Sequence, residues 1–161
     1  MCGIFFYKGN KYYKNNLLYN FNAIYNRGPD SSNIINIDDT IMGFHRLAIN
    51  DLSASGMQPF INNDIYLICN GEIYNHDTIR REHFFVSKSH SDCEVIIHLY
   101  QLYGIEKTCQ LLDGVFSFVL YDKKLETVYV ARDPYGVRPL FIGNTIDHDI
   151  FVCSELKGIH D

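Results

Sequence analysis

The order of strand-like and helical segments constrains the fold of this chain more than any other feature of its sequence. Short apolar segments predict strands at residues 3–8, 40–49, 65–69, 115–121, 127–131, 139–142 and 150–153. Helical spacing of apolar residues predicts helices at residues 12–26, 92–103 and 105–111. Because strands are grouped on both sides of a helical pair, an α+β layered fold is favoured over a doubly wound sheet. With 161 residues, the chain is expected to form one domain.

The helix at residues 92–103 has the clearest signals at its two ends. Ser91 and Glu94 have the spacing of a capping box, in which two side chains satisfy the first free backbone N–H groups. Gly104 follows the last apolar residue and is expected to end the helix. The Arg27–Asp30 segment contains Gly-Pro and predicts a turn.

Composition excludes several classes of protein. The net charge of −5 and the lack of a basic run argue against nucleic acid or an anionic membrane surface as the main partner. No apolar stretch approaches the ~20 residues that cross a bilayer, and no signal peptide begins the chain, so a cytoplasmic protein is expected. No Cys-x-x-Cys motif and no closely spaced histidine pair is present, so we expect no metal site. Phosphate-binding glycine motifs are also absent.

Cys2 has an unusual position, directly after the initiator methionine. Because cysteine is small, an aminopeptidase is expected to remove Met1. Cys2 would then be the first residue, with a free α-amine. A thiol nucleophile needs a base within hydrogen-bond reach. The α-amine, with an ordinary pKa of about 7.7–8.0, would supply one on the same residue. Position alone leaves open that Cys2 is an incidental small residue before a strand.

Other candidate residues carry weaker signals when each is taken alone. Asn70 and Gly71 follow an apolar strand and could form an oxyanion hole from a side-chain amide and a backbone N–H. An Asn-Gly pair is equally typical of a hairpin turn. Arg46 lies in an apolar strand and could bind a carboxylate in bidentate fashion, or reach solvent from an edge strand. Asp92 could bind an ammonium group, or only complement the dipole of its helix.

Taken together, these residues suggest a site for a free α-amino acid. Arg46 would bind its carboxylate and Asp92 its amine. A cysteine nucleophile beside an oxyanion hole indicates acyl transfer. The free amino acids whose side chains carry an acyl group are glutamine and asparagine. This hypothesis assumes that the segments converge in space, which spacing alone does not show.

A series of motifs extends over almost the whole chain. Their sequences stand at residues 1–4, 27–30, 44–49, 56–59, 70–75, 91–94, 112–116, 131–140 and 154–158. In this order they resemble the glutamine amidotransferase domain of the asparagine synthetases, closest to the eukaryotic type. These domains are class II amidotransferases and N-terminal-nucleophile hydrolases. The resemblance implies a single domain over residues 1–161, folded as a four-layer αββα sandwich of two antiparallel sheets.

The resemblance also implies a role for each matching residue. Cys2 would be the nucleophile, and its α-amine the general base. Asn70 and the Gly71 N–H would form the oxyanion hole. The residues that would bind L-glutamine are Arg46, Leu47, Ala48, Ile49, Asn50, Glu72 and Asp92. The implied reaction forms a γ-glutamyl thioester on Cys2, releases ammonia, and ends with hydrolysis to glutamate.

The chain departs from the family pattern in a few places. Asn50 replaces a commonly apolar residue, Cys93 a Thr or Gly, and Ser117 an Ala. The chain ends at Asp161, where the family's domain continues for additional strands, so the fold is expected to lack the last of them. The family's ATP-dependent synthetase domain is not expected within these residues, and ATP and Mg²⁺ would belong to it, so no cofactor is expected on this chain.

Several readings of the function remain open from sequence. The leading one is a glutamine-hydrolysing enzyme that passes ammonia to a synthetase domain or subunit. A second is another class II branch, because the motif at residues 131–140 also suits the phosphoribosylamine-forming and glucosamine-phosphate-forming enzymes. A third is a truncated, non-catalytic module that binds glutamine or a partner. The oligomeric state is not indicated by the sequence.

Overall fold

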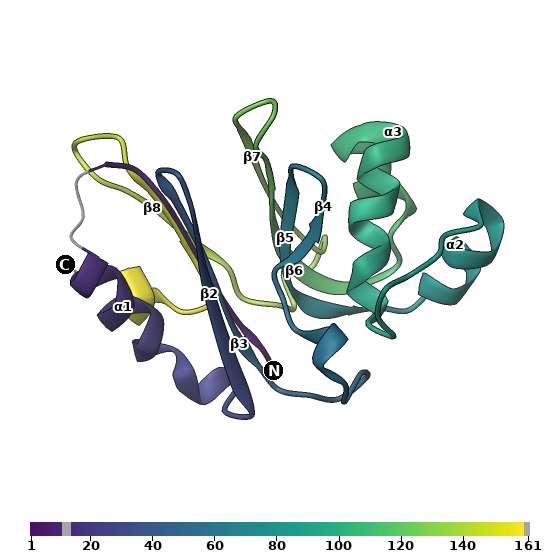
Figure 1. Ribbon diagram of the computed structural model, residues 1–161, viewed down its shortest axis with the longest axis horizontal. Helices are drawn as coiled ribbons and strands as arrows, with labels where there is room; N and C mark the ends of the chain where they lie inside the picture. Colours follow the sequence, from purple (N-terminus) through teal and green to yellow (C-terminus); the bar gives the residue numbers. More distant parts are fainter. Residues whose placement is uncertain (11–13, 160–161) are drawn as a thin grey trace.

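The computed structural model describes residues 1–10 and 14–159. Two antiparallel sheets stack face to face between helices (Figure 1). The strands are β1 (Gly3–Lys8), β2 (Ser31–Ile37), β3 (Thr40–Arg46), β4 (Phe60–Asn62), β5 (Ile65–Ile73), β6 (Gly114–Asp122), β7 (Thr127–Arg132), β8 (Phe141–Asn144) and β9 (Ile150–Cys153). The α-helices are α1 (Lys14–Ala23), α2 (His76–His83) and α3 (Val95–Leu111). Short 3-10 helices are η1 (Tyr25–Arg27), η2 (Ala54–Gly56), η3 (Asp92–Glu94) and η4 (Leu156–Ile159).

The first sheet has the strand order β2-β3-β1-β9-β8, and the second has the order β4-β5-β6-β7. In Figure 1, α1 covers the outer face of the first sheet, and α3 covers the outer face of the second. The layers are therefore helix, sheet, sheet and helix, as expected from the resemblance. None of the helices in the described ranges has the length and hydrophobicity of a membrane span.

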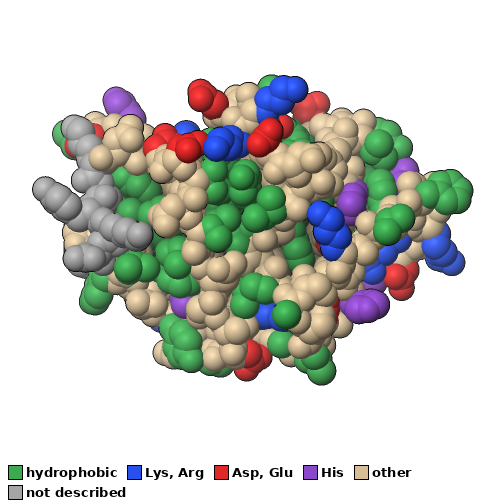
Figure 2. Space-filling model, viewed as in Figure 1, with side chains coloured by type: hydrophobic (Ala, Val, Ile, Leu, Met, Phe, Trp, Pro, Cys, Tyr) green, Lys and Arg blue, Asp and Glu red, His purple; other side chains and the backbone are tan. Residues whose placement is uncertain are grey.

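Each interface between layers has its own apolar core. Ile4, Phe44, Ile68 and Val119 are buried between the two sheets. A second core packs α3 against the outer face of the β4–β7 sheet, and a third packs α1 against the other sheet. This arrangement follows from strand alternation, since successive side chains point to opposite faces and both faces are covered. Figure 2 shows basic and acidic side chains interspersed along one edge of the molecule.

Most of the predicted strands and helices are confirmed, with shifted ends. The strand predicted at 40–49 ends at Arg46, and the one predicted at 65–69 continues to Ile73 because β6 pairs with it along that whole length. The helix predicted at 12–26 is described from Lys14 and ends at Ala23; residues 12 and 13 lie outside the described ranges. Gly104 separates the two predicted helical segments of α3, with a positive φ of 74°.

The predicted capping box is wrong. Ser91 makes no side-chain hydrogen bond to the start of the helix. Glu94 instead accepts hydrogen bonds from the backbone N–H groups of Lys88 and Ser89, both at 2.8 Å. The Ser89 hydroxyl donates a third, at 2.6 Å. Burial alone would raise the pKa of Glu94, but the contact with His98 on α3, the Ser89 hydroxyl and these two N–H groups lower it to about 2.

Candidate active site

A cavity of about 120 Å³ brings together segments that are far apart in the sequence. It lies where the N-terminus meets the loop after β3, the last part of β5 and η3. The predicted site residues that line it are Cys2, Arg46, Leu47, Ile49, Asn50, Asn70, Gly71, Glu72 and Asp92. Ala48 does not line the cavity, and its N–H donates to Asp30 Oδ2 at 2.8 Å.

Strand pairing places Cys2 in this cavity. Gly3 of β1 pairs with His45 of β3, so Cys2 lies beside the residues at the end of β3. The Leu47 N–H donates to Cys2 Sγ at an N···S distance of 3.4 Å. Arg27 Nε donates to the Cys2 carbonyl oxygen at 2.9 Å, which fixes the backbone of Cys2.

Burial raises the pKa of the Cys2 thiol above its ordinary value. The Leu47 N–H and the positive charges of the N-terminus and Arg46 oppose this effect without cancelling it. At neutral pH the sulfur is therefore a thiol, and it needs a base to become a nucleophile. Among the described residues that line the cavity, none is a histidine.

Asn70 presents an unused hydrogen-bond donor beside Cys2. Its side chain is buried, and within the described part of the chain Asn70 Nδ2 has no hydrogen-bond partner. A buried amide donor without a partner is costly unless a ligand uses it. Gly71 follows directly, and a Cβ there would lie 2.7 Å from Phe116 Cα on β6. The close approach of the two strands therefore requires glycine at this position.

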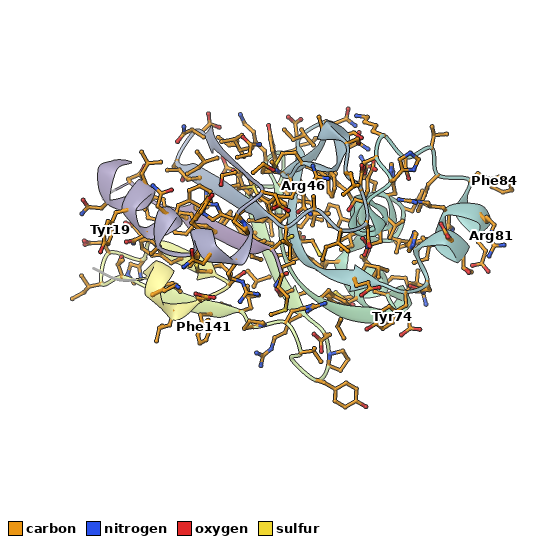
Figure 3. All side chains as sticks on the ribbon, turned by 90° about the horizontal axis from the view of Figure 1, so that it is seen from below. Tyr19, Arg46, Tyr74, Arg81, Phe84 and Phe141 are labelled. Atoms are coloured by element: carbon orange, nitrogen blue, oxygen red, sulfur yellow. The ribbon has the colours of Figure 1, made fainter. Side chains whose placement is uncertain are left out.

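Arg46 is a buried cation at the wall of the cavity, and Figure 3 shows it in the interior of the molecule. Its side chain donates to the backbone carbonyls of Ser53, at 2.7 Å, and of Asp51. Within the described residues these bonds go to backbone oxygens rather than to a carboxylate. They orient the guanidinium. The Asp51 carboxylate also lies near it, and the pKa of Asp51 is lowered to about 2 by the Ser53 hydroxyl and, among smaller effects, by the charge of Arg46.

Asp92 is a buried anion in the wall of the same cavity, with 3% of its surface exposed. Its oxygens accept hydrogen bonds from the Asn50 amide at 3.0 Å and from the Ile73 N–H at 2.6 Å. Both donors are neutral, so the carboxylate charge is not paired by them. Asn50 thus makes the cavity more polar than an apolar residue would. Glu72 lines the cavity from an exposed position.

Sequence reasoning missed several residues of this cavity. They are Met1, Phe44, Asp51, Gly56, Gln58, Cys69, Ser91, Cys93 and Arg138. All of these except Asp51 and Cys69 lie within the motifs that carry the resemblance, which is a signal for them, although no role is assigned to them from the sequence. Gln58 binds the backbone of Cys69, accepting from its N–H at 2.6 Å and donating to its carbonyl at 3.1 Å. Arg138 Nη1 contacts Met1 Sδ at 2.6 Å.

No group of three or more potential metal ligands occurs within residues 1–10 and 14–159. The groups available in the cavity are the Cys2 thiol, the free amide donor of Asn70 and the buried charges of Arg46, Asp51 and Asp92. A buried cation and a buried anion in one cavity fit a zwitterion, and an amide donor in the same cavity as a thiol fits acyl transfer.

Comparison with known proteins agrees with this geometry. The family model described as "Glutamine amidotransferase domain" matches residues 1–161. Asparagine synthetase [glutamine-hydrolyzing] from Mus musculus is 41% identical over 165 residues, covering 99% of this chain and 29% of the mouse protein. The protein of that name from Triphysaria versicolor is 47% identical over 140 residues, covering 84% of this chain and 23% of its own length.

The chain thus spans less than a third of the length of these curated relatives. The match to the family model nevertheless extends over all of this chain, and the fold has the expected layers. The chain belongs to the glutamine amidotransferase domain family and is homologous to the glutamine-hydrolysing asparagine synthetases.

Proposed function

We propose that this chain hydrolyses free L-glutamine to glutamate and ammonia, with Cys2 as the nucleophile. The observation that carries the proposal is that the Cys2 thiol and the unpartnered Asn70 amide share one cavity with the buried charges of Arg46 and Asp92. Each feature alone has an ordinary structural explanation. Together they form a site in which the reacting bond and both ends of an amino acid have a partner.

The buried charges of Arg46 and Asp92 indicate the substrate class. Arg46 would bind the α-carboxylate of glutamine, and Asp92, with Glu72 at the mouth, would bind its α-ammonium group. The loop from Leu47 to Asn50 would surround the same end of the substrate. A glutamine within a peptide lacks both free charges, so its binding would leave the buried charges of Arg46 and Asp92 without a substrate partner, at an energetic cost. The site therefore favours the free amino acid.

The first half of the reaction forms a thioester. Removal of Met1, which lines the cavity, would expose the α-amine of Cys2 next to its own thiol. The amine takes the thiol proton, and the sulfur attacks the side-chain amide carbon of glutamine. Asn70 Nδ2 and the Gly71 N–H stabilise the oxygen that becomes negative. The protonated amine then donates its proton to the departing nitrogen, and ammonia leaves.

The second half regenerates the enzyme. The α-amine deprotonates a water molecule, which attacks the γ-glutamyl thioester, and the same oxyanion hole stabilises the second intermediate. The carbon–sulfur bond breaks, Cys2 recovers its proton and glutamate leaves. Splitting one amide hydrolysis into two steps lowers each barrier. These steps require no cofactor on this chain.

The homology also suggests where the ammonia goes. The relatives are named as asparagine synthetases, and they are more than three times as long as the region matched here. We propose that an ammonia-accepting synthetase domain or subunit is the partner of this chain. Asparagine formation would need that partner.

Ammonia release from glutamine by the purified chain tests the proposal, with loss of Met1 confirmed by intact mass. We expect activity in the parent and none in Cys2→Ala. Cys109→Ala is the matched control, because Cys109 lies on α3 outside the cavity and its loss should leave activity unchanged. Insertion of an alanine before Cys2 moves the α-amine without removing the thiol, and should also abolish activity. A folded, processed parent without activity would refute hydrolysis by this chain alone and favour a non-catalytic glutamine-binding module.

A further inference from the structure

Asp51 lies in the wall of the cavity, in the loop that follows Arg46, and the proposed reaction gives it no role. The residue is buried, with 6% of its surface exposed, and a buried carboxylate is costly unless it is hydrogen-bonded. Asp51 Oδ1 accepts from the N–H and the hydroxyl of Ser53, at 2.8 and 2.6 Å. Asp51 Oδ2 accepts from the His90 N–H at 2.9 Å. The carboxylate therefore joins two segments of the chain that are 39 residues apart.

The first of these segments holds the guanidinium of Arg46. The Ser53 carbonyl accepts from Arg46 Nη1 at 2.7 Å, and the Asp51 carbonyl accepts from Arg46 Nη2. Because Asp51 Oδ1 binds Ser53 through two groups, it fixes the turn that presents both carbonyls. The loop also closes tightly around the guanidinium, since a Cβ at Gly56 would lie 2.5 Å from Arg46 Nη2 and 2.9 Å from Asp51 Cβ. The direction of the guanidinium thus depends on Asp51.

The second segment carries Asp92. His90 stands two residues before Asp92, and the bond from its N–H to Asp51 Oδ2 holds this backbone against the loop that follows β3. Asn50 makes a second link, from its amide to Asp92 Oδ1 at 3.0 Å. Asn50 is exposed whereas Asp51 is buried, and a hydrogen bond is electrostatically stronger in a buried environment than in water. The Asp51 link is therefore the stronger constraint on the position of Asp92.

We propose that Asp51 is a positioning residue, which sets the separation between the Arg46 guanidinium and the Asp92 carboxylate and so selects ligands that carry both an α-carboxylate and an α-ammonium group. The inference rests on the proposed function in one respect, namely that Arg46 and Asp92 bind the two ends of glutamine. A ligand held at both ends is sensitive to this separation. A ligand held by Arg46 alone is not.

The negative charge of Asp51 offers a competing explanation with the opposite consequence. If Asp51 only balanced the charge of Arg46, its neutralisation would strengthen the attraction of Arg46 for any carboxylate, with or without an amine on the ligand. The hydrogen bonds favour the positioning role. Both oxygens of the carboxylate bind Ser53 and His90, and the printed bonds of the Arg46 side chain go to backbone carbonyls instead.

Ligand binding to inactive protein tests the positioning role. Cys2→Ala protein, with Met1 absent by intact mass, is titrated in a calorimeter with L-glutamine and with 4-carbamoylbutanoate, which is glutamine without its α-amino group. Both ligands carry the same carboxylate and the same side-chain amide. The ratio of their dissociation constants therefore measures what the contact with Asp92 contributes, and a change of charge near Arg46 affects both ligands alike.

Asp51→Asn is the decisive variant. The amide oxygen can still accept both bonds from Ser53, but the amide nitrogen then faces the His90 N–H, and two donors cannot bond to each other. Arg46 stays oriented while the segment that carries Asp92 is released. We expect the preference for glutamine over 4-carbamoylbutanoate to fall about 10-fold, the lower end of what one hydrogen bond to a charged group contributes. Asp51→Glu keeps the charge but displaces both segments, and should weaken the binding of both ligands.

Asp149→Asn is the matched control, because it neutralises another buried carboxylate. Asp149 is 5% exposed, accepts from the Tyr7 hydroxyl at 2.9 Å and from the Asn10 N–H at 3.3 Å, and does not line the cavity. Its substitution should leave the ratio of dissociation constants unchanged. Thermal unfolding of each variant shows that the ratio is measured on folded protein.

Two outcomes would overturn the inference. One is an unchanged ratio in folded Asp51→Asn protein, and the other is tighter binding of both ligands, which charge balance alone predicts. Because binding is measured without turnover, failure of this inference and failure of the proposed function can be told apart. The expected fall in the ratio, in a chain that does not hydrolyse glutamine, would refute catalysis alone. An active chain whose Asp51→Asn variant keeps the ratio would refute the positioning role alone.

Discussion

Replacement of Asn70 by alanine separates a catalytic role from a structural role for this side chain. Asn70 is buried, but Asn70 Nδ2 makes no hydrogen bond within the described residues. Its removal therefore breaks no bond of that nitrogen, and we expect the free energy of unfolding to change by no more than about 1 kcal/mol. Loss of one oxyanion-hole donor typically lowers kcat by about 10²–10³, which is about 2.7–4 kcal/mol.

The expected result for Asn70→Ala is thus a large loss of turnover in a stable protein. Because the donor acts on the oxygen only as it becomes negative, kcat should fall while KM for glutamine changes little. The assay is glutamate formation at varied glutamine concentration, together with thermal unfolding of the same sample. Asn62→Ala is the matched control, since Asn62 Nδ2 donates at the surface, to Gln101 Oε1 at 2.8 Å. An Asn70→Ala protein with parental kcat, or one whose loss lies wholly in KM, would refute the oxyanion assignment.

Two further predictions follow from buried charge and from a buried histidine. Arg46→Lys keeps the positive charge but loses the planar guanidinium, and with it one charge-assisted hydrogen bond to the substrate carboxylate. KM for glutamine, measured by Michaelis kinetics, should therefore rise by about 10- to 150-fold. An unchanged KM would contradict a contact between Arg46 and the carboxylate. Burial lowers the pKa of His45, whose ring bonds Ser32 and the Phe21 carbonyl. The unfolded chain then binds the proton better, so the free energy of unfolding should fall as pH drops below about 6.5. Thermal unfolding between pH 5 and 8 measures this loss of stability, and NMR titration of His45 measures its pKa in the folded protein. A pKa at or above the ordinary value of histidine would contradict the predicted direction of the pH dependence.

The layers of the fold follow from sequence patterns that the structure confirms, but some elements gave no usable signal. Strand β2 (Ser31–Ile37) has an edge position and a run of serine and asparagine, so its apolar alternation is weak. Strand β4 is three residues long, too short for a periodic pattern. Helix α2 (His76–His83) buries only Ile79, so no apolar stripe marks it. In each case tertiary pairing or packing, rather than local preference, determines the element.

The candidate site, like the fold, could be predicted from the sequence only in part. The residue types of Cys2, Arg46, Asn70 and Asp92 suggested amino-acid acyl chemistry, but their spacing gave no reason for them to meet. Pairing of β1 with β3 and the length of β5 bring them into one cavity.

The most direct test of the account is to trap the thioester with hydroxylamine. Processed protein, with Met1 absent by mass, is incubated with glutamine and hydroxylamine, and γ-glutamyl hydroxamate is measured. If Cys2 forms a γ-glutamyl thioester, hydroxylamine will compete with water, and the parent will produce hydroxamate while Cys2→Ala produces none. Equal formation of hydroxamate or glutamate by Cys2→Ala would contradict the central claim that the first residue of the mature chain performs the reaction.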